Sequence, residues 1–174
     1  GGKFLTRILK GQDKIMTELK PTILISESIS EVRTDLINIL NPSFNILIAD
    51  TEEDIFGQIN LNPELSIIIM NPVQENLNGF DLVKKFKSFP QLKHISFIFV
   101  ISKDDDVSQI KGLELGVIDF ITLPLKEKIV PTFVKSIIKK HNEVRKEEQA
   151  KILNIQAQEQ KKINSIIHID KITG

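Results

Sequence analysis

The sequence predicts an α/β fold: a doubly wound, five-stranded parallel sheet between helices, with an N-terminal helix before it and a long C-terminal stalk helix after it. Two observations support this class. Five short runs rich in Ile, Val and Phe do not alternate with polar residues, which is typical of parallel strands buried on both faces. An amphipathic segment separates each run from the next, and such crossovers are right-handed in nearly all known cases, so helices are expected on both faces.

The elements follow one another regularly. Residues 4–19 carry apolar side chains near helical spacing around Gly11, which predicts an interrupted helix. The predicted strands are TILIS (22–26), NILIA (45–49), LSIIIM (65–70), SFIFVIS (96–102) and DFIT (119–122). Helices are expected at residues 29–40, 51–59, 78–86 and 105–115, and a last helix follows the fifth strand. Gly116 is placed to end the helix before that strand.

The amino-acid composition argues against several classes of function. Lys plus Arg and Asp plus Glu number 23 each among 174 residues, so there is no electrostatic argument for binding nucleic acid or an anionic membrane. Cysteine is absent, which excludes disulfides and thiolate catalysis and fits a reducing compartment. No apolar run approaches the roughly 18 residues that a membrane span needs. We therefore expect a cytoplasmic protein whose partners are proteins.

The sequence beyond Pro131 has one long, polar-rich helical pattern. Its apolar positions lie about three or four residues apart: Val134, Ile137, Val144, Ile152, Ile155, Ile163 and Ile166. This stripe predicts a stalk that packs on a second copy or connects to another domain, and a solvated extension is the alternative. The expected organisation is a linker helix at residues 1–20, a core domain at 21–140 and a stalk at 141–167.

The functional crevice of a doubly wound sheet lies beyond the carboxyl ends of its strands. The residues expected there are Glu27 and Ser28, Asn71, Ile101 and Ser102, and Leu123 and Pro124. The simplest interpretation of Asn71 is a strand-end residue whose amide hydrogen-bonds the neighbouring loops.

Three stretches carry a resemblance to a known family: ILISES at the first strand, NGFDLVKKFK after the third, and GLELGVIDFITLP across the fourth helix and fifth strand. Over about residues 21–140 the sequence resembles the response-regulator receiver domain, which implies the flavodoxin-like strand order 2-1-3-4-5. In that family an Asp ending the third strand accepts a phosphoryl group, and two acidic residues after the first strand hold Mg²⁺. A Ser or Thr ends the fourth strand, and a Lys precedes the Pro after the fifth.

Asn71 stands at the phosphoacceptor position when residues are counted back from Gly79-Phe80. An acyl phosphate forms by attack of a carboxylate oxygen, and a neutral amide is a poor nucleophile for phosphorus. Pro72 has no backbone N–H with which to form a cyclic imide, so deamidation to Asp is disfavoured. The sequence therefore predicts a pseudo-receiver that cannot be phosphorylated.

The other positions of the resembled site depart in the same direction. Glu27 followed by Ser28 supplies one carboxylate where Mg²⁺ requires two, so no magnesium cofactor is expected. Ile101 occupies the position of the hydroxyl, and Leu123 that of the neutralising Lys. Ser102 replaces the hydroxyl only if the register is off by one, and strand alternation would turn it away from the crevice.

Four further features have simpler interpretations. Pro124 is a candidate cis-proline by the resemblance. Residues 104–106 are three aspartates before a helix, where its dipole favours negative charge. Arg33 is a weak candidate contact for a cyclic dinucleotide, with a solvated helix residue as the alternative. The histidines lack metal-ligand spacing; they are His94, His141 and His168.

The last residues, HIDKITG (168–174), resemble the entry of a GGDEF diguanylate cyclase domain, where a long helix runs into Asp-x-Leu-Thr-Gly. A receiver, a stalk helix and this motif occur in the order of PleD-type regulators, which carry two receivers before a cyclase. The resemblance implies a non-enzymatic homodimeric adaptor that couples an upstream receiver to a downstream cyclase in cyclic di-GMP signalling. Residues 1–20 are then a linker from that upstream receiver.

Other functions remain open at this point. The chain could be a functional two-component receiver, or a stand-alone protein-interaction module. A further alternative takes His168, with nearby Asp170, as the phosphorylatable histidine of a kinase dimerisation helix, but neither Pro nor a basic run follows to support it.

Overall fold

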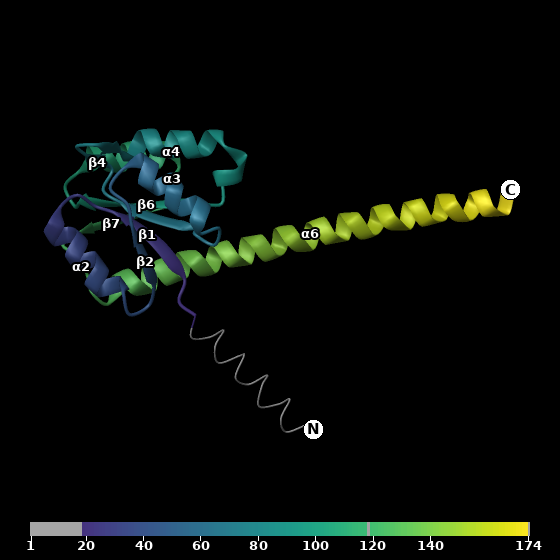
Figure 1. Cartoon of the computed structure of the whole chain (residues 1–174), viewed down its shortest axis with the longest axis horizontal. Helices are drawn as coiled ribbons and strands as arrows, with labels where there is room; N and C mark the ends of the chain where they lie inside the picture. The colour runs from purple at the N-terminus through teal and green to yellow at the C-terminus, as the bar shows by residue number, and fades with distance from the viewer. Residues whose placement is uncertain (1–18, 118, 174) are drawn as a thin grey trace, which may run out of the picture. The chain divides into compact units, whose positions relative to one another are not determined.

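A five-stranded parallel sheet forms the centre of the domain (Figure 1). The computed structural model describes residues 19–117 and 119–173, with side-chain surroundings described to residue 167. The strands are β1 (Thr22–Ser26), β2 (Asn45–Ile48), β3 (Ile67–Met70), β6 (Ser96–Ser102) and β7 (Asp119–Leu123). Their order is β2-β1-β3-β6-β7, and every neighbouring pair is parallel. This confirms the predicted doubly wound class and the order 2-1-3-4-5 of its sheet strands.

Burial differs between the centre and the edges of this sheet. All four residues of β3 are buried, as are six of the seven in β6. The edge strand β2 has no fully buried residue, and β7 has one, Ile121. The expectation that all five strands are buried on both faces therefore holds for the central strands and is wrong for the edges, because an edge strand lacks a neighbour on one side.

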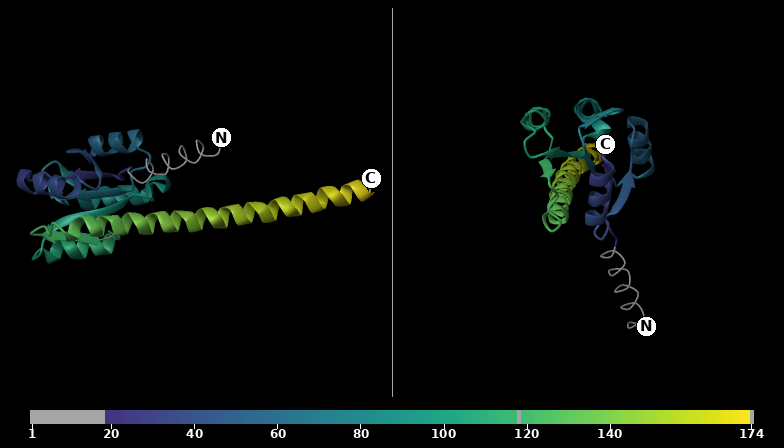
Figure 2. Two further views of the ribbon diagram at one scale, coloured as in Figure 1. Left: turned by 90° about the horizontal axis from the view of Figure 1, so that it is seen from below. Right: turned by 90° about the vertical axis from the view of Figure 1, so that its left-hand side faces the viewer.

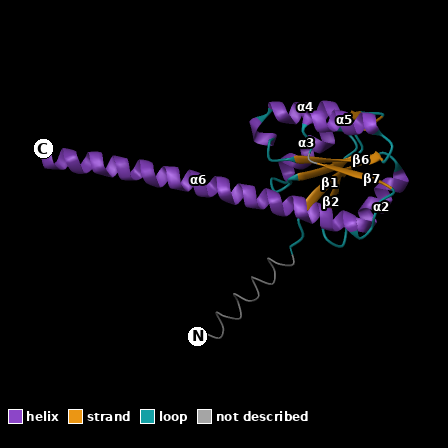
Figure 3. Cartoon of the chain, turned by 180° about the vertical axis from the view of Figure 1, so that it is seen from behind, coloured by secondary structure: helices purple, strands orange, loops and turns teal. Residues whose placement is uncertain are grey.

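Helices cover both faces of the sheet. They are α2 (Ser30–Leu40), α3 (Glu52–Leu61), α4 (Gly79–Ser88) and α5 (Asp106–Leu115), with a short 3₁₀ helix at Pro90–Leu92. Figures 2 and 3 show α3, α4 and α5 on one face and α2 on the other. Under α4 the ring of Phe86 packs edge-on against Phe97 (centroids 4.9 Å apart), and that of Phe80 packs against Phe99 (5.4 Å). Such edge-to-face pairs are favourable aromatic contacts.

Side-chain caps explain where three helices begin. Thr51 accepts a hydrogen bond from the Asp54 amide at the start of α3, and Asn78 caps α4. Asp105 caps α5 by accepting from the Ser108 amide at 3.0 Å. These side chains satisfy N–H groups that have no partner within the helix. The predicted stop at Gly116 is confirmed: it has a φ of 78°, in the left-handed region that favours glycine at a helix C-terminus.

A small hairpin between β3 and α4 was not predicted. Its strands β4 (Val73–Gln74) and β5 (Leu77–Asn78) pair antiparallel. Two-residue strands are too short to produce a recognisable alternation in sequence. The hairpin matters for the site because it begins three residues after β3 ends and carries Gln74 back over the sheet.

The last helix, α6, is continuous from Ile129 to Thr173. This confirms the single long helix that the sequence beyond Pro131 predicts. The chain divides within α6 into two units, the first ending at Val134 and the second beginning at Lys135. The predicted helix at residues 1–20 lies almost wholly outside the described residues. Among the described helices, none is long and apolar enough to cross a bilayer.

Candidate functional site

Two residues from neighbouring strand ends form the centre of the site. Glu27 follows β1 and Asn71 follows β3, and the Asn71 backbone N–H extends the parallel ladder by donating to the Ser26 carbonyl at 3.0 Å. This register brings the two side chains together, and the Asn71 amide Nδ2 donates to the Glu27 Oε1 at 3.0 Å. Glu27 is 1% exposed and Asn71 is half-buried.

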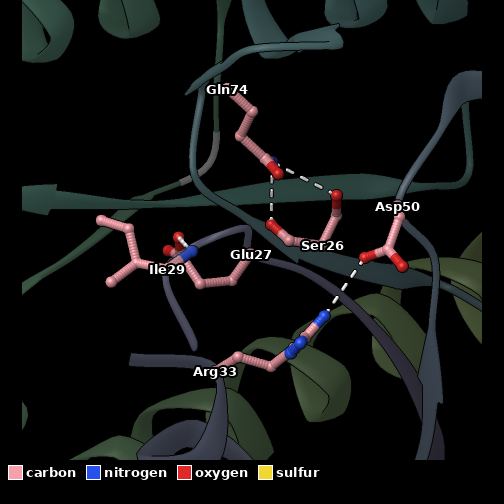
Figure 4. Close-up of polar contacts among 6 residues, drawn as sticks. All are labelled: Ser26, Glu27, Ile29, Arg33, Asp50 and Gln74. Carbon is pink, nitrogen blue, oxygen red and sulfur yellow. Dashed lines mark hydrogen bonds and ion pairs between the residues drawn. The ribbon is translucent and has the colours of Figure 1, made fainter. Parts of the chain in front are cut away.

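The Glu27 carboxylate is satisfied by N–H donors from the protein itself. Besides Asn71, the backbone N–H of Ile29 donates to the same Oε1 at 2.9 Å. Figure 4 shows Glu27 turned back beside Ile29 at the start of α2. A buried carboxylate needs such compensation, and charge-assisted hydrogen bonds are the strong kind. Here the compensation comes from two neutral donors.

The orientation of the Asn71 amide is fixed at both ends. Its Oδ1 accepts a hydrogen bond from the Val73 backbone N–H at 3.0 Å, while its Nδ2 faces Glu27. The amide therefore acts as acceptor toward the hairpin and donor toward the carboxylate. An aspartate at this position could accept from Val73 equally well, but it would place a second carboxylate oxygen about 3 Å from that of Glu27.

Gln74 completes this edge of the sheet, and sequence reasoning missed it. Its Nε2 lies 2.8 Å from the Asn71 carbonyl, 3.1 Å from the Ser26 carbonyl and 3.3 Å from the Ser26 Oγ. Figure 4 shows the side chain reaching down to Ser26 from the hairpin. The amide thus covers the carbonyls at the ends of β1 and β3. The sequence signal that could have found Gln74 was a polar residue in the loop after the third strand. The direction of its side chain, however, depends on the hairpin, which was not predicted.

The remaining predicted positions lie around this centre but do not join its hydrogen bonds. Ser28 is exposed, next to the buried Glu27. On the other side, Ile101 is 4% exposed, and Leu123 pairs in register with the exposed Ser102. The two positions on β6 and β7 where the resemblance implies a hydroxyl and an amine therefore hold apolar side chains. The Leu123–Pro124 peptide bond is cis, the isomer expected there.

Arg33 and Asp105 have partners of their own. The Arg33 Nη1 on α2 forms an ion pair with the Asp50 Oδ1 at 3.3 Å, as Figure 4 shows. Hydrogen bonds from the backbone and side chain of Ser108 hold the pKa of Asp105 below its usual value. Asp105 thus serves as the cap of α5, and Asp106 lies in its first turn, consistent with the helix-dipole interpretation.

Comparison with known proteins finds relatives in two-component signalling, although no family model matches the chain. It is 28% identical over 127 residues to histidine kinase P4 of Formosa agariphila, which spans 73% of this chain and 9% of the kinase. It is 30% identical over 71 residues to the response regulator PleD of Caulobacter vibrioides, spanning 41% of this chain and 16% of PleD. The two-component response regulator ORR3 of Oryza sativa is 24% identical over 128 residues, 73% of this chain and 98% of that protein. The chain therefore corresponds to a small part of the first two relatives.

Solved structures show the same fold. A response regulator from Chloroflexus aurantiacus matches with a TM-score of 0.64 and 22% identity, covering 70% of this chain and 99% of that one. A two-component system response regulator/GGDEF domain protein also matches with a TM-score of 0.64, at 13% identity, covering 71% of this chain and 51% of that one. Together with the strand order, these neighbours show that the domain has the flavodoxin-like fold of receiver domains, and its sequence relatives are two-component signalling proteins.

Proposed function

We propose that this chain is a pseudo-receiver: a non-catalytic signalling adaptor on the receiver fold that is not phosphorylated and acts through protein contacts. The hydrogen bond between the Asn71 amide and the Glu27 carboxylate carries the proposal. The strand-end position that the resemblance assigns to the phosphoacceptor holds a neutral amide, which is a poor nucleophile for phosphorus. That amide is also engaged at both of its polar atoms.

The surroundings of Asn71 support the same proposal. Mg²⁺ binds near-octahedrally through oxygen ligands, usually including one or two carboxylates. Glu27 supplies the only carboxylate in the hydrogen-bonded centre among the described residues, and its Oε1 already accepts two N–H groups. Ile101 and Leu123 offer neither a hydroxyl nor a cation to a phosphoryl group. We therefore propose that the site takes no magnesium cofactor.

The signalling context is a further part of the proposal. We infer that the module links an upstream receiver to a downstream GGDEF diguanylate cyclase in a homodimer, and so serves cyclic di-GMP signalling. The likeness to PleD, the likeness to a response regulator/GGDEF domain protein, and the motif Asp170-x-Ile172-Thr173-Gly174 support it. The coding sequence that follows residue 174 tests it directly: a GG(D/E)EF motif is expected, and its absence would favour a stand-alone interaction module.

Intact-mass spectrometry tests the silent site. The chain is incubated with acetyl phosphate and Mg²⁺, and its mass is expected to stay unchanged under conditions that phosphorylate an active receiver run in parallel. A mass gain of one phosphoryl group that is lost on alkaline treatment would show an acyl phosphate, and would establish the alternative of a functional receiver. Replacing Glu27 with Gln separates the two outcomes further, because a genuine Mg²⁺-dependent gain should disappear in that variant.

A further inference from the structure

Five of the exposed apolar residues of the second unit repeat every eleven residues, while Leu153 and Ile167 lie outside this repeat. Val144, Ile155 and Ile166 are eleven apart, and so are Ile152 and Ile163. All five are about half exposed, between 49% and 59%. They lie on α6, which Figure 1 shows as an unbroken helix, so the spacing translates directly into position on the helix surface.

An eleven-residue period corresponds to about 3.67 residues per turn, slightly more than a straight helix. With this period the five side chains form one continuous stripe, which does not wind around the helix in the left-handed sense of a heptad stripe. Between residues 144 and 166, a seven-residue frame drawn through Ile152 and Ile155 would place four charged residues in the seam, whereas the eleven-residue stripe contains two, and charged residues there are unfavourable. The eleven-residue repeat therefore describes α6 better than a heptad does, and it predicts a supercoil of the opposite, right-handed sense.

Charged residues follow the same repeat. Glu148 and Glu159 are eleven apart and fall within the apolar stripe, and Lys151 and Lys162 each follow three residues later at its border. Both glutamates and both lysines are exposed in the single chain. Each repeat thus presents apolar positions, one acidic position and one basic position in the same geometry.

We propose that the stripe of α6 pairs with a second copy of this chain, parallel and in register. The inference rests on the homodimer of the proposed function and assigns its interface. In the aligned arrangement isoleucine meets isoleucine, and each glutamate lies in a common layer within reach of the partner's lysine, so the charges are complementary. If the two helices shift along their axis by anything other than a whole repeat, a glutamate carboxylate of one helix contacts an isoleucine of the other with no cation beside it. Burying such an unpaired charge is costly. A polar layer fixes coiled-coil register in this way.

Single cysteines test both orientation and register, because the chain has none of its own. Val144→Cys and Ile166→Cys lie at the two ends of the stripe, and Lys146→Cys and Ala157→Cys, also eleven apart, lie on the opposite side of α6. We expect both stripe variants of the whole chain to form disulfide-linked dimers under mild oxidation. The two control variants should cross-link at least about tenfold more slowly, because a disulfide needs Cβ atoms within roughly 4.5 Å.

Other results would overturn the inference in recognisable ways. Cross-linking of neither end variant, with the unmodified chain dimeric by light scattering, would mean an antiparallel arrangement or an interface elsewhere. Equal cross-linking of stripe and control variants would mean random collision, and a monomeric chain would exclude the paired stalk altogether. None of these results changes the acetyl phosphate measurement, so failure of the paired stalk is distinguishable from failure of the silent site.

Discussion

Replacing Asn71 with Asp tests the central contact of the site most directly. The change removes the donor that lies 3.0 Å from the Glu27 Oε1 and puts a carboxylate oxygen in its place. Losing a hydrogen bond to a charged group costs about 1.5–3 kcal/mol, and repulsion between the two carboxylates adds to it. The cost has a ceiling, because one carboxyl can take up a proton instead. At pH 7.5 that ceiling is about 5 kcal/mol, from roughly 3.6 pH units at 1.36 kcal/mol each.

We therefore predict that Asn71→Asp lowers the free energy of unfolding by about 2–4 kcal/mol at pH 7.5 in EDTA, a loss of roughly 8–15 °C in Tm. The loss must shrink as the pH falls. A carboxyl whose pKa is raised in the folded state contributes stability that is present at low pH and lost as pH rises through that pKa, so the variant approaches the parent toward pH 5. Urea unfolding at a series of pH values measures this difference.

Two companion variants sharpen the test. Asn76→Asp makes the same chemical change on an exposed turn of the hairpin and should alter stability by less than about 0.5 kcal/mol. Glu27→Gln combined with Asn71→Asp restores one donor and one carboxylate, and should recover more than half of the loss. An Asn71→Asp variant as stable as the parent at pH 7.5, with no dependence on pH, would refute the Glu27 contact.

Three further changes probe the surroundings of the site. Gly112→Ala on α5 should destabilise the domain by about 1–3 kcal/mol, because the new Cβ would lie 2.7 Å from the Phe120 ring. Thermal unfolding measures this loss, and an unchanged Tm would contradict the close approach of helix and ring. The matched change Gly57→Ala on α3, where nothing lies within 4 Å, should raise stability by up to about 1 kcal/mol in the same assay. Asp105→Ala should cost about 1 kcal/mol at pH 7 through loss of the α5 cap. The pKa of Asp105 is lowered in the folded state, so its contribution is present above the ordinary value of 3.8 and lost as pH falls below it, and the parent and variant should converge in acid urea titrations.

The sequence predicted the fold well because several independent signals indicated the same elements. Central strands such as IIIM of β3 are continuously apolar, and each is followed by a segment with its own cap or stop, such as Asn78 or Gly116. Spacing from Gly79 also placed Asn71 at a strand end, where the structure has it. A local count suffices for such a position, because the chain between β3 and α4 has a fixed length.

The contacts of Asn71 were harder to predict than its position. Hydrogen bonds to the neighbouring loops were expected, and the one to Val73 agrees. Its contact with Glu27 joins residues 44 apart in the sequence and depends on the side-by-side register of β1 and β3, which no local pattern encodes. The same holds for Gln74, which reaches Ser26 only because the two-residue strands of the hairpin turn it back.

Helix α5 shows how tertiary packing can override an amphipathic pattern. Its small residues Ser108 and Gly112 face the core, while Val107, Ile110 and Leu113 are more than half exposed. A hydrophobic-face argument would orient this helix the other way round. The large rings beside it explain the difference, since a Cβ at position 112 would also lie 3.4 Å from Phe99, so only a small residue fits between the helix and the sheet.

The hydrogen bonds at the strand ends give a physical reason for the proposal that this site takes no ligand. Carboxylates clustered at one edge of a sheet repel one another unless a bound cation or protonation offsets their charge. The stability of such a site therefore depends on what it binds. Here a single buried carboxylate, Glu27, meets two N–H donors, and Gln74 covers the adjacent carbonyls. The polar groups at this edge are therefore hydrogen-bonded within the chain itself. Under the proposed function, the module changes state through its contacts with other chains or domains, and a signal enters and leaves through those contacts.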